Sequence, residues 1–185
     1  LKISEGCDHT CAFCAIPLMR GPHRSRPLAD VVREARFLES QGAREINLIA
    51  QDLGHYGRDA AGGPRLPDLV RALLAETGVP WYRMLYVYSA GITEDLVALL
   101  AREPRLVPYL DIPIQHASDR MLEAMRRPER QRTIRAKVAR LREAVPDIAL
   151  RTTALVGFPG ETDADFRELL ELADELRFDR LGAFA

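Results

Sequence analysis

The chain has 185 residues and 47% of them are hydrophobic, which is enough apolar material for one domain with a sizeable core. Its formal net charge is −1, so no basic field favours direct nucleic-acid binding by this segment. No apolar run approaches the roughly 20 residues that a membrane span needs, and no signal-peptide pattern is present, so we expect a cytoplasmic protein without membrane association.

The first third of the chain combines a cysteine-rich stretch with two strand-like segments. A short strand is expected at residues 1–4, directly before the cysteines. Residues 15–26 contain prolines, glycine and basic side chains, and we predict a loop there. A helix is expected to begin at Pro27 and to stop near Gly42, because apolar residues recur between them at helical spacing.

Strands and helices then alternate to the end of the chain. Further strands are predicted at residues 46–50, 83–88, 109–114 and 148–156 and from Asp179 onward, and helices at 66–74, 94–100, 121–125, 134–145 and 163–176. Thr93 and Thr162 are suited to cap two of these helices. Alternation predicts an α/β fold with parallel strands, as an open doubly wound sheet or a curved partial barrel. In both, ligands bind at the carboxyl ends of the strands.

All three cysteines of the chain, Cys7, Cys11 and Cys14, lie within eight residues at the spacing C-x3-C-x2-C. Thiolates at this spacing favour one soft metal centre, and clustered cysteines suit a reducing compartment. Three cysteines leave one position of a four-thiolate iron–sulfur cluster open. Buried free cysteines, or a zinc ion completed by His9 or His23, are the alternatives.

Polar side chains recur where the predicted strands end. They are Gln51, Asp52, Ser89, Gln115 and His116, with Arg151 inside the fifth strand. Exposed strand ends are often polar for no functional reason. Their shared position on the cysteine side nevertheless indicates a binding site, in which carboxamide and hydroxyl groups would suit ribose and Arg151 a carboxylate.

The cysteine spacing, with the aromatic Phe13 before the last cysteine, resembles the signature of radical S-adenosylmethionine (SAM) enzymes. The resemblance implies a (β/α)6 partial, open TIM-like barrel. It also implies a 4Fe–4S cluster on Cys7, Cys11 and Cys14 whose open iron binds SAM, with Phe13 near the adenine. The turn at Gly157 is similar to one through which the family's backbone approaches adenine, although a tight turn alone would explain it. The family's Gly-Gly-Glu after the second strand is replaced by Ala50-Gln51-Asp52, so the partner of the SAM ammonium group is unassigned.

Several longer stretches resemble the methylthiotransferase branch of that family. They are residues 2–7, 17–21, 25–27, 111–118, 125–128 and 156–162. The resemblance implies methylthiolation of the β-carbon of an aspartate in a small-subunit ribosomal protein, with flavodoxin or ferredoxin as electron donor. It further implies that residues 1–185 are a core domain separated from an N-terminal methylthiotransferase domain, which carries a second cluster, and from a C-terminal TRAM domain.

Three other functions fit the sequence. The first is tRNA adenosine methylthiotransfer, which a strongly basic further domain would favour. The second is a radical SAM enzyme that transfers no sulfur. The third, from a different class, is a zinc-stapled α/β binding module, which would be colourless whereas an iron–sulfur protein is brown.

Overall fold

Parallel strands form the centre of the computed structural model, which describes residues 1–185. The main sheet contains, in spatial and chain order, β3 (Glu45–Leu48), β4 (Trp81–Met84), β5 (Leu106–Asp111), β6 (Ala149–Leu155) and β7 (Arg180–Phe184). The start of the chain extends this row, because Lys2 forms a parallel bridge with Ile49. Six parallel segments therefore lie side by side in chain order, which confirms the predicted partial barrel.

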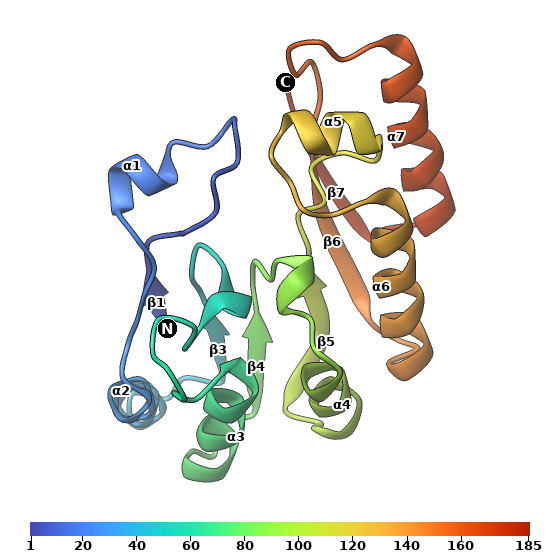
Figure 1. Cartoon of the computed structure of the whole chain (residues 1–185). Coiled ribbons are helices and arrows are strands. Elements are labelled where there is room, and N and C mark those ends of the chain that lie inside the picture. Colours follow the sequence, from blue (N-terminus) through green and yellow to red (C-terminus); the bar gives the residue numbers. More distant parts are fainter.

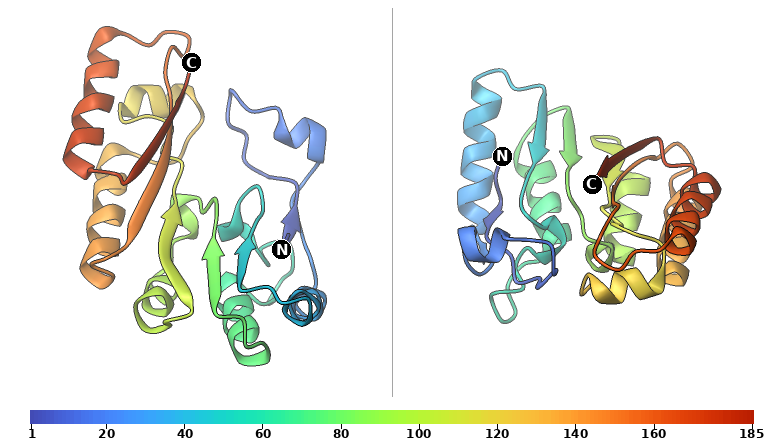
Figure 2. Two further views of the ribbon diagram at one scale, coloured as in Figure 1. Left: turned by 180° about the vertical axis from the view of Figure 1, so that it is seen from behind. Right: turned by 90° about the horizontal axis from the view of Figure 1, so that it is seen from above.

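Helices connect successive strands and cover one side of the sheet (Figures 1 and 2). They are α2 (Leu28–Ser40), α3 (Leu66–Glu76), α4 (Glu94–Arg102), α5 (Asp119–Ala124), α6 (Gln131–Ala144) and α7 (Asp163–Leu176). Their apolar faces and the strands bury a core cluster of 36 residues. This arrangement follows from parallel pairing, which needs a crossover after every strand. None of the helices is long and apolar enough to cross a membrane.

The predicted helix ends are confirmed at the three positions where the signals were strongest. The Thr93 side chain accepts the backbone N–H of Leu96 at 3.2 Å at the start of α4. Thr162 and Asp165 form a reciprocal capping box before α7. Gly42 follows α2 with a φ of 87°, a conformation that costs glycine little.

The region around the cysteines differs from the sequence prediction. Residues 15–26 are not a simple loop, because they contain α1 (Ile16–Arg20) and β2 (Arg24–Ser25). The strand predicted at residues 1–4 corresponds to the segment that Lys2 bridges to Ile49, and a short strand that was not predicted, β1 (Ser4–Glu5), follows it and pairs with β2 antiparallel. The prolines and glycines suggested a loop, yet Pro17 lies in the first turn of α1, where a missing N–H costs nothing.

The strands of the main sheet end earlier at their carboxyl ends than the sequence predicts. The third predicted strand is β4 and ends at Met84, two residues before Tyr86 with its φ of 68°. The fourth is β5, which ends at Asp111 rather than at Ile114. The residues beyond each strand end form loops. In Figure 1 these carboxyl ends lie on the same side as residues 7–14, which carry the three cysteines and are called the cysteine segment below.

Candidate cofactor site

A cavity of about 230 Å³ lies between the cysteine segment and the carboxyl ends of the strands. In Figure 1 the segment around α1 stands above β3 and faces the region of α5 across this end of the barrel. The cavity is lined by Cys7, His9, Cys11, Phe13, Cys14, Ile16, Ala50, Gln51, Tyr86, Tyr88, Gln115 and Arg127. Six of the residues predicted from sequence, including all three cysteines, are therefore brought together.

The three thiols occupy one wall of the cavity and are each partly exposed. Cys11 Sγ lies 3.1 Å from the Tyr88 hydroxyl, and the backbone N–H of Cys14 donates to the Cys11 carbonyl at 3.1 Å. Burial raises the pKa of Cys7 and of Cys11, and the proximity of the other thiols raises it further. Cys7 and Cys11 thus favour their neutral form, and a metal that binds them would have to displace their protons.

His9 fastens the cysteine segment to the barrel. Its Nε2 lies 2.9 Å from Asp52 Oδ2, and its ring stacks on Tyr88 with centroids 4.0 Å apart. The other carboxylate oxygen, Asp52 Oδ1, accepts the backbone N–H groups of Gly54 at 2.9 Å and Tyr88 at 3.2 Å. Buried Asp52 therefore joins the segment to the ends of two strands.

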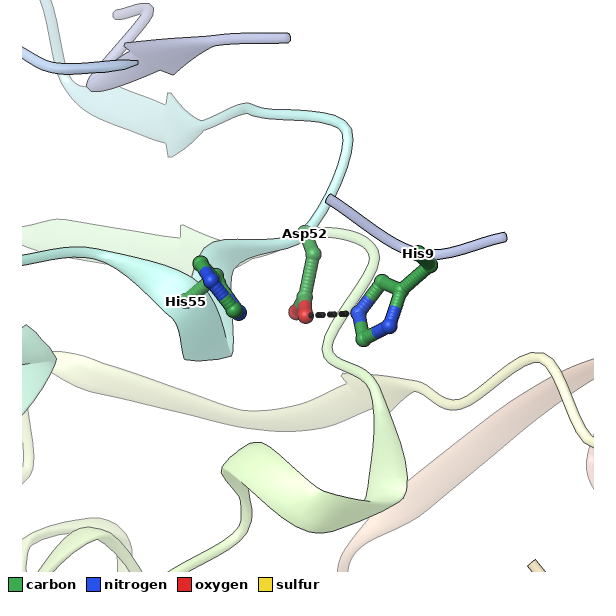
Figure 3. A group of neighbouring side chains, drawn as sticks. All are labelled: His9, Asp52 and His55. Atoms are coloured by element: carbon green, nitrogen blue, oxygen red, sulfur yellow. Dashed lines mark hydrogen bonds and ion pairs between the residues drawn. The ribbon is translucent and has the colours of Figure 1, made fainter. Parts of the chain in front are cut away.

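Figure 3 shows His55 on the other side of Asp52 from His9. Ligand atoms of these three residues lie within 4.8 Å of one another. Both oxygens of Asp52 already accept hydrogen bonds, and His55 Nε2 lies 3.3 Å from Asp8 Oδ2. We therefore interpret His9, Asp52 and His55 as a structural group that anchors the cysteine segment. The same bonds count against zinc completed by His9, while His23 does not line the cavity.

Two lining residues have a backbone conformation that side chains other than glycine rarely adopt. Tyr86 has a φ of 68° and Gln115 a φ of 67°. The Gln115 backbone is held in place, because its N–H donates to Thr153 O at 2.8 Å and its carbonyl accepts from Leu155 N at 2.7 Å. Strain of this kind gathers at binding sites, where the surrounding structure overrides local preference.

Three of the predicted cofactor-binding residues lie outside the lining of this cavity. Ser89 Oγ donates to Glu129 Oε1 at 2.9 Å, and Arg151 Nη1 donates to Asp111 Oδ2 at 2.7 Å. Gly157, with a φ of 72°, lies in the turn after β6, where its N–H donates to Glu161 Oε2. A role for these three residues in cofactor binding stays a prediction.

A sequence profile of the Radical SAM superfamily matches residues 1–173, which include the whole cavity. The chain belongs to the Radical SAM superfamily. Membership implies a 4Fe–4S cluster and SAM as cofactors.

Curated relatives of this radical SAM chain are named ribosomal protein uS12 methylthiotransferase RimO. The protein from Geobacter sulfurreducens is 55% identical over 184 residues, and that from Desulforudis audaxviator is 54% identical over 185 residues. Each match covers all of this chain and 41% of the relative, so the chain spans about two fifths of these proteins. The resemblance to methylthiotransferases noted in the sequence is thereby confirmed.

Solved structures agree on the fold. The radical SAM methyltransferase TsrM from Kitasatospora setae matches with a TM-score of 0.78 and 21% identity, over 99% of this chain and 35% of TsrM. The radical SAM enzyme coproporphyrinogen III oxidase (HemN) from Escherichia coli matches with a TM-score of 0.65 and 17% identity, over 85% of this chain and 36% of that one. At these identities the likeness concerns the fold alone.

The donor set of the cavity fits a radical SAM cluster. Three thiols face one cavity and the sequence contains no fourth cysteine. Thiolate is the ligand that iron–sulfur clusters take, and three thiolates leave one iron free for another ligand. The remaining wall offers the carboxamides of Gln51 and Gln115, which can donate and accept hydrogen bonds.

Tyr88 and Arg127 are among the residues of the radical SAM cavity that sequence reasoning missed. Tyr88 was expected inside a strand, but its hydroxyl contacts the sulfur of Cys11. Its ring stacks on the His9 ring and also contacts the Arg127 guanidinium. Arg127 was noted only as part of a stretch resembling methylthiotransferases. No local pattern separates it from the exposed Arg126 beside it, because only the fold around α5 decides which of the two is buried.

His23 contacts the cysteine segment, because its backbone N–H donates to Asp8 Oδ1 at 2.9 Å, and we expect it to make the stability of the fold pH-dependent. It is buried, and burial together with nearby His55 lowers its pKa. The unfolded chain therefore takes up a proton near the ordinary histidine pKa of about 6.5, while folded His23 stays neutral. We expect full stability above about pH 6.5 and a falling free energy of unfolding as the pH drops below it.

Urea unfolding at several pH values between about 5 and 8 checks this expectation for His23. The variant His23→Gln keeps a polar side chain of similar size and has no titratable group. Its free energy of unfolding should vary less with pH than that of the parent chain. An equally steep pH dependence in both proteins would contradict the assignment to His23.

Proposed function

We propose that this chain is the radical-generating core of a methylthiotransferase that modifies the β-carbon of an aspartate in a small-subunit ribosomal protein. The observation that carries the proposal is the identity of about half of all residues, over the whole chain, with relatives named uS12 methylthiotransferase. The site supports it, because three thiols and two carboxamides meet in one cavity at the carboxyl ends of the strands.

In this proposal Cys7, Cys11 and Cys14 hold the 4Fe–4S cluster. When bound, the cluster supplies one electron that cleaves a carbon–sulfur bond of SAM. The protein's own residues bind and orient the cofactor. Half-exposed Phe13 offers a ring face to the adenine, and the carboxamides of Gln51 and Gln115 offer hydrogen bonds to the ribose or the amino-acid end of SAM.

The apolar side chains of the cavity have a separate role. Ile16, Tyr86 and Tyr88 line it beside the cysteines, and Tyr88 is itself buried. Such a lining keeps water away from the reacting atoms and protects a reactive species from side reactions.

The remaining parts of the reaction are assigned to segments beyond this chain. The relatives are more than twice as long as the part that this chain matches. We assign a second cluster, as sulfur source, and the grip on the ribosomal protein to an N-terminal methylthiotransferase domain and a C-terminal TRAM domain. A low-potential donor such as flavodoxin or ferredoxin would supply electrons, and the reaction would take place in the cytoplasm.

Two assays test the proposed function. The reconstituted chain, given dithionite and SAM without air, should slowly release deoxyadenosine and methionine, because no substrate positions the radical. A longer form carrying the further domains should add one methylthio group to the ribosomal protein, read by mass spectrometry. Modification of tRNA instead would move the protein to the tRNA branch, and absence of SAM cleavage would overturn the proposal.

The division between domains has its own check. Incubation of the ribosomal protein with this chain alone should leave its mass unchanged. A gain of one methylthio group would show that the sulfur source lies within residues 1–185.

A further inference from the structure

Arg127 is the only side chain with a permanent charge among the residues that line the cysteine cavity. It lies in the connection between α5 and α6, and its side chain is only 2% exposed. Burial lowers its pKa, and the opposing charge of Glu129 raises it. A buried charge is costly unless its surroundings compensate for it, so this position calls for a partner.

The contacts of Arg127 place its guanidinium between the barrel and Cys11. Nη2 donates to Pro113 O at 2.6 Å, and the guanidinium carbon lies 3.7 Å from the centre of the Tyr88 ring. Nη1 points to the sulfur side, 3.9 Å from Cys11 Sγ. The guanidinium is thus held from two sides and presents its remaining donor to a cysteine.

The cysteine segment is fastened to the same connection through its backbone. The N–H of Ala12, next to Cys11, donates to Met125 O at 3.0 Å. The backbone N–H of Arg127 in turn donates to Leu122 O in α5 at 2.7 Å. These bonds hold the backbones near Arg127 and Cys11 together, while Pro113 and Tyr88 hold the guanidinium itself.

Glu129 neutralises this charge only in part. Its Oε1 accepts a hydrogen bond from Arg127 Nη2 at 3.3 Å, whereas its Oε2 lies 3.2 Å from Arg127 Nε without a hydrogen bond between them. Glu129 also accepts a hydrogen bond from Ser89 through Oε1. Neither contact with Arg127 involves Nη1, so this end of the guanidinium remains available to a negatively charged group on the side of Cys11.

We propose that Arg127 is a positioning residue that holds the Cys11 thiolate and raises the reduction potential of the cluster. This inference rests on the proposed function, in which the three cysteines are the cluster ligands. A cluster becomes more negative by one charge when it takes up an electron. A nearby buried cation stabilises that reduced form more than the oxidised form. Glu129, as the counter-charge, moderates the effect.

The test is a potentiometric titration of the reconstituted cluster, followed by its electron paramagnetic resonance signal. Arg127→Met removes the charge and keeps an unbranched apolar chain. At the potential that half-reduces the parent cluster, the ratio of reduced to oxidised cluster in this variant should fall about tenfold, which equals about 59 mV for one electron. Glu129→Gln should shift the potential in the opposite direction.

The matched control is Arg126→Met, which removes the same charge one residue away from an exposed side chain. Its potential should equal that of the parent. Arg127→Lys keeps the charge but not the forked donors, and it should retain most of the parent potential. A change of charge is expected to shift the reduction potential in opposite directions in Arg127→Met and Glu129→Gln, whereas a loosened fold is not.

Three results would overturn the proposal. The first is an unchanged potential in Arg127→Met. The second is a change confined to SAM affinity in calorimetry, which would make Arg127 a cofactor contact. The third, decisive if Arg127→Met does not fold, is that Glu129→Gln keeps the parent potential. Failure of the parent chain to bind iron would overturn the proposed ligands as well, whereas a loaded cluster with unmoved potentials overturns only this inference.

Discussion

Replacing Cys11 with alanine is expected to abolish binding of the 4Fe–4S cluster. Cys11 is one of only three cysteines, and the other two offer too few thiolates for a cluster. Its sulfur lies 3.1 Å from the Tyr88 hydroxyl, and the sequence contains no fourth cysteine that could replace it. The reconstituted parent chain should contain about four irons, and Cys11→Ala should contain close to none and lack the brown colour.

A control for Cys11→Ala comes from the same segment. Ala12→Ser alters an exposed side chain next to Cys11 and keeps all three thiols. This variant should bind iron and sulfide like the parent. Iron and sulfide analysis after identical anaerobic reconstitution decides the matter, and a full cluster in Cys11→Ala would refute the assignment of Cys11 as a ligand.

Replacing Gly6 with alanine is expected to displace the cysteine segment. Gly6 has a φ of 78°, and a Cβ there would overlap the Pro22 carbonyl oxygen and lie 2.6 Å from that of Gly21. The backbone N–H of the adjacent Cys7 donates to the Gly21 carbonyl at 3.1 Å, so the segment cannot relax without losing this bond. Unfavourable φ and overpacking together should cost about 2–5 kcal/mol of unfolding free energy.

Gly42 provides the matched control for the Gly6 variant. It has a φ of 87°, and a Cβ there would meet nothing within 4 Å. Gly42→Ala should therefore cost only the conformational penalty of about 1–2 kcal/mol and leave iron binding intact. Urea unfolding and iron content are to be measured in both variants. Equal losses of stability and full iron binding in both would show that the close approach at Gly6 is unimportant.

The alternation of strands and helices was predictable from sequence because it depends on local patterns. The apolar spacing in α2, the capping residue Thr93 and the box at Thr162 act within a few residues of themselves. The choice of a barrel over an open sheet was not local. It came from a resemblance, and the structure confirmed it through the unbroken strand order from the Lys2 bridge to β7.

The errors near the site have a common physical cause. Within residues 15–26, β2 forms because Arg24 and Ser25 pair with Glu5 and Ser4 of β1. β4 ends before Tyr86, because Tyr86 adopts a positive φ while its carbonyl accepts the N–H of Leu53 from another strand end. Tertiary hydrogen bonds of this kind override the β propensity of an aromatic run.

The sequence by itself determined the three cysteines, their spacing and the side of the barrel on which they lie, because these follow from covalent order and strand direction. Only the tertiary structure decided which polar residues share their cavity. Gln51 and Gln115 line it, whereas Ser89 and Arg151 are bonded to Glu129 and Asp111 outside it. The structure alone separates buried Arg127 from exposed Arg126, because the turn after α5 decides which of two identical side chains faces Cys11.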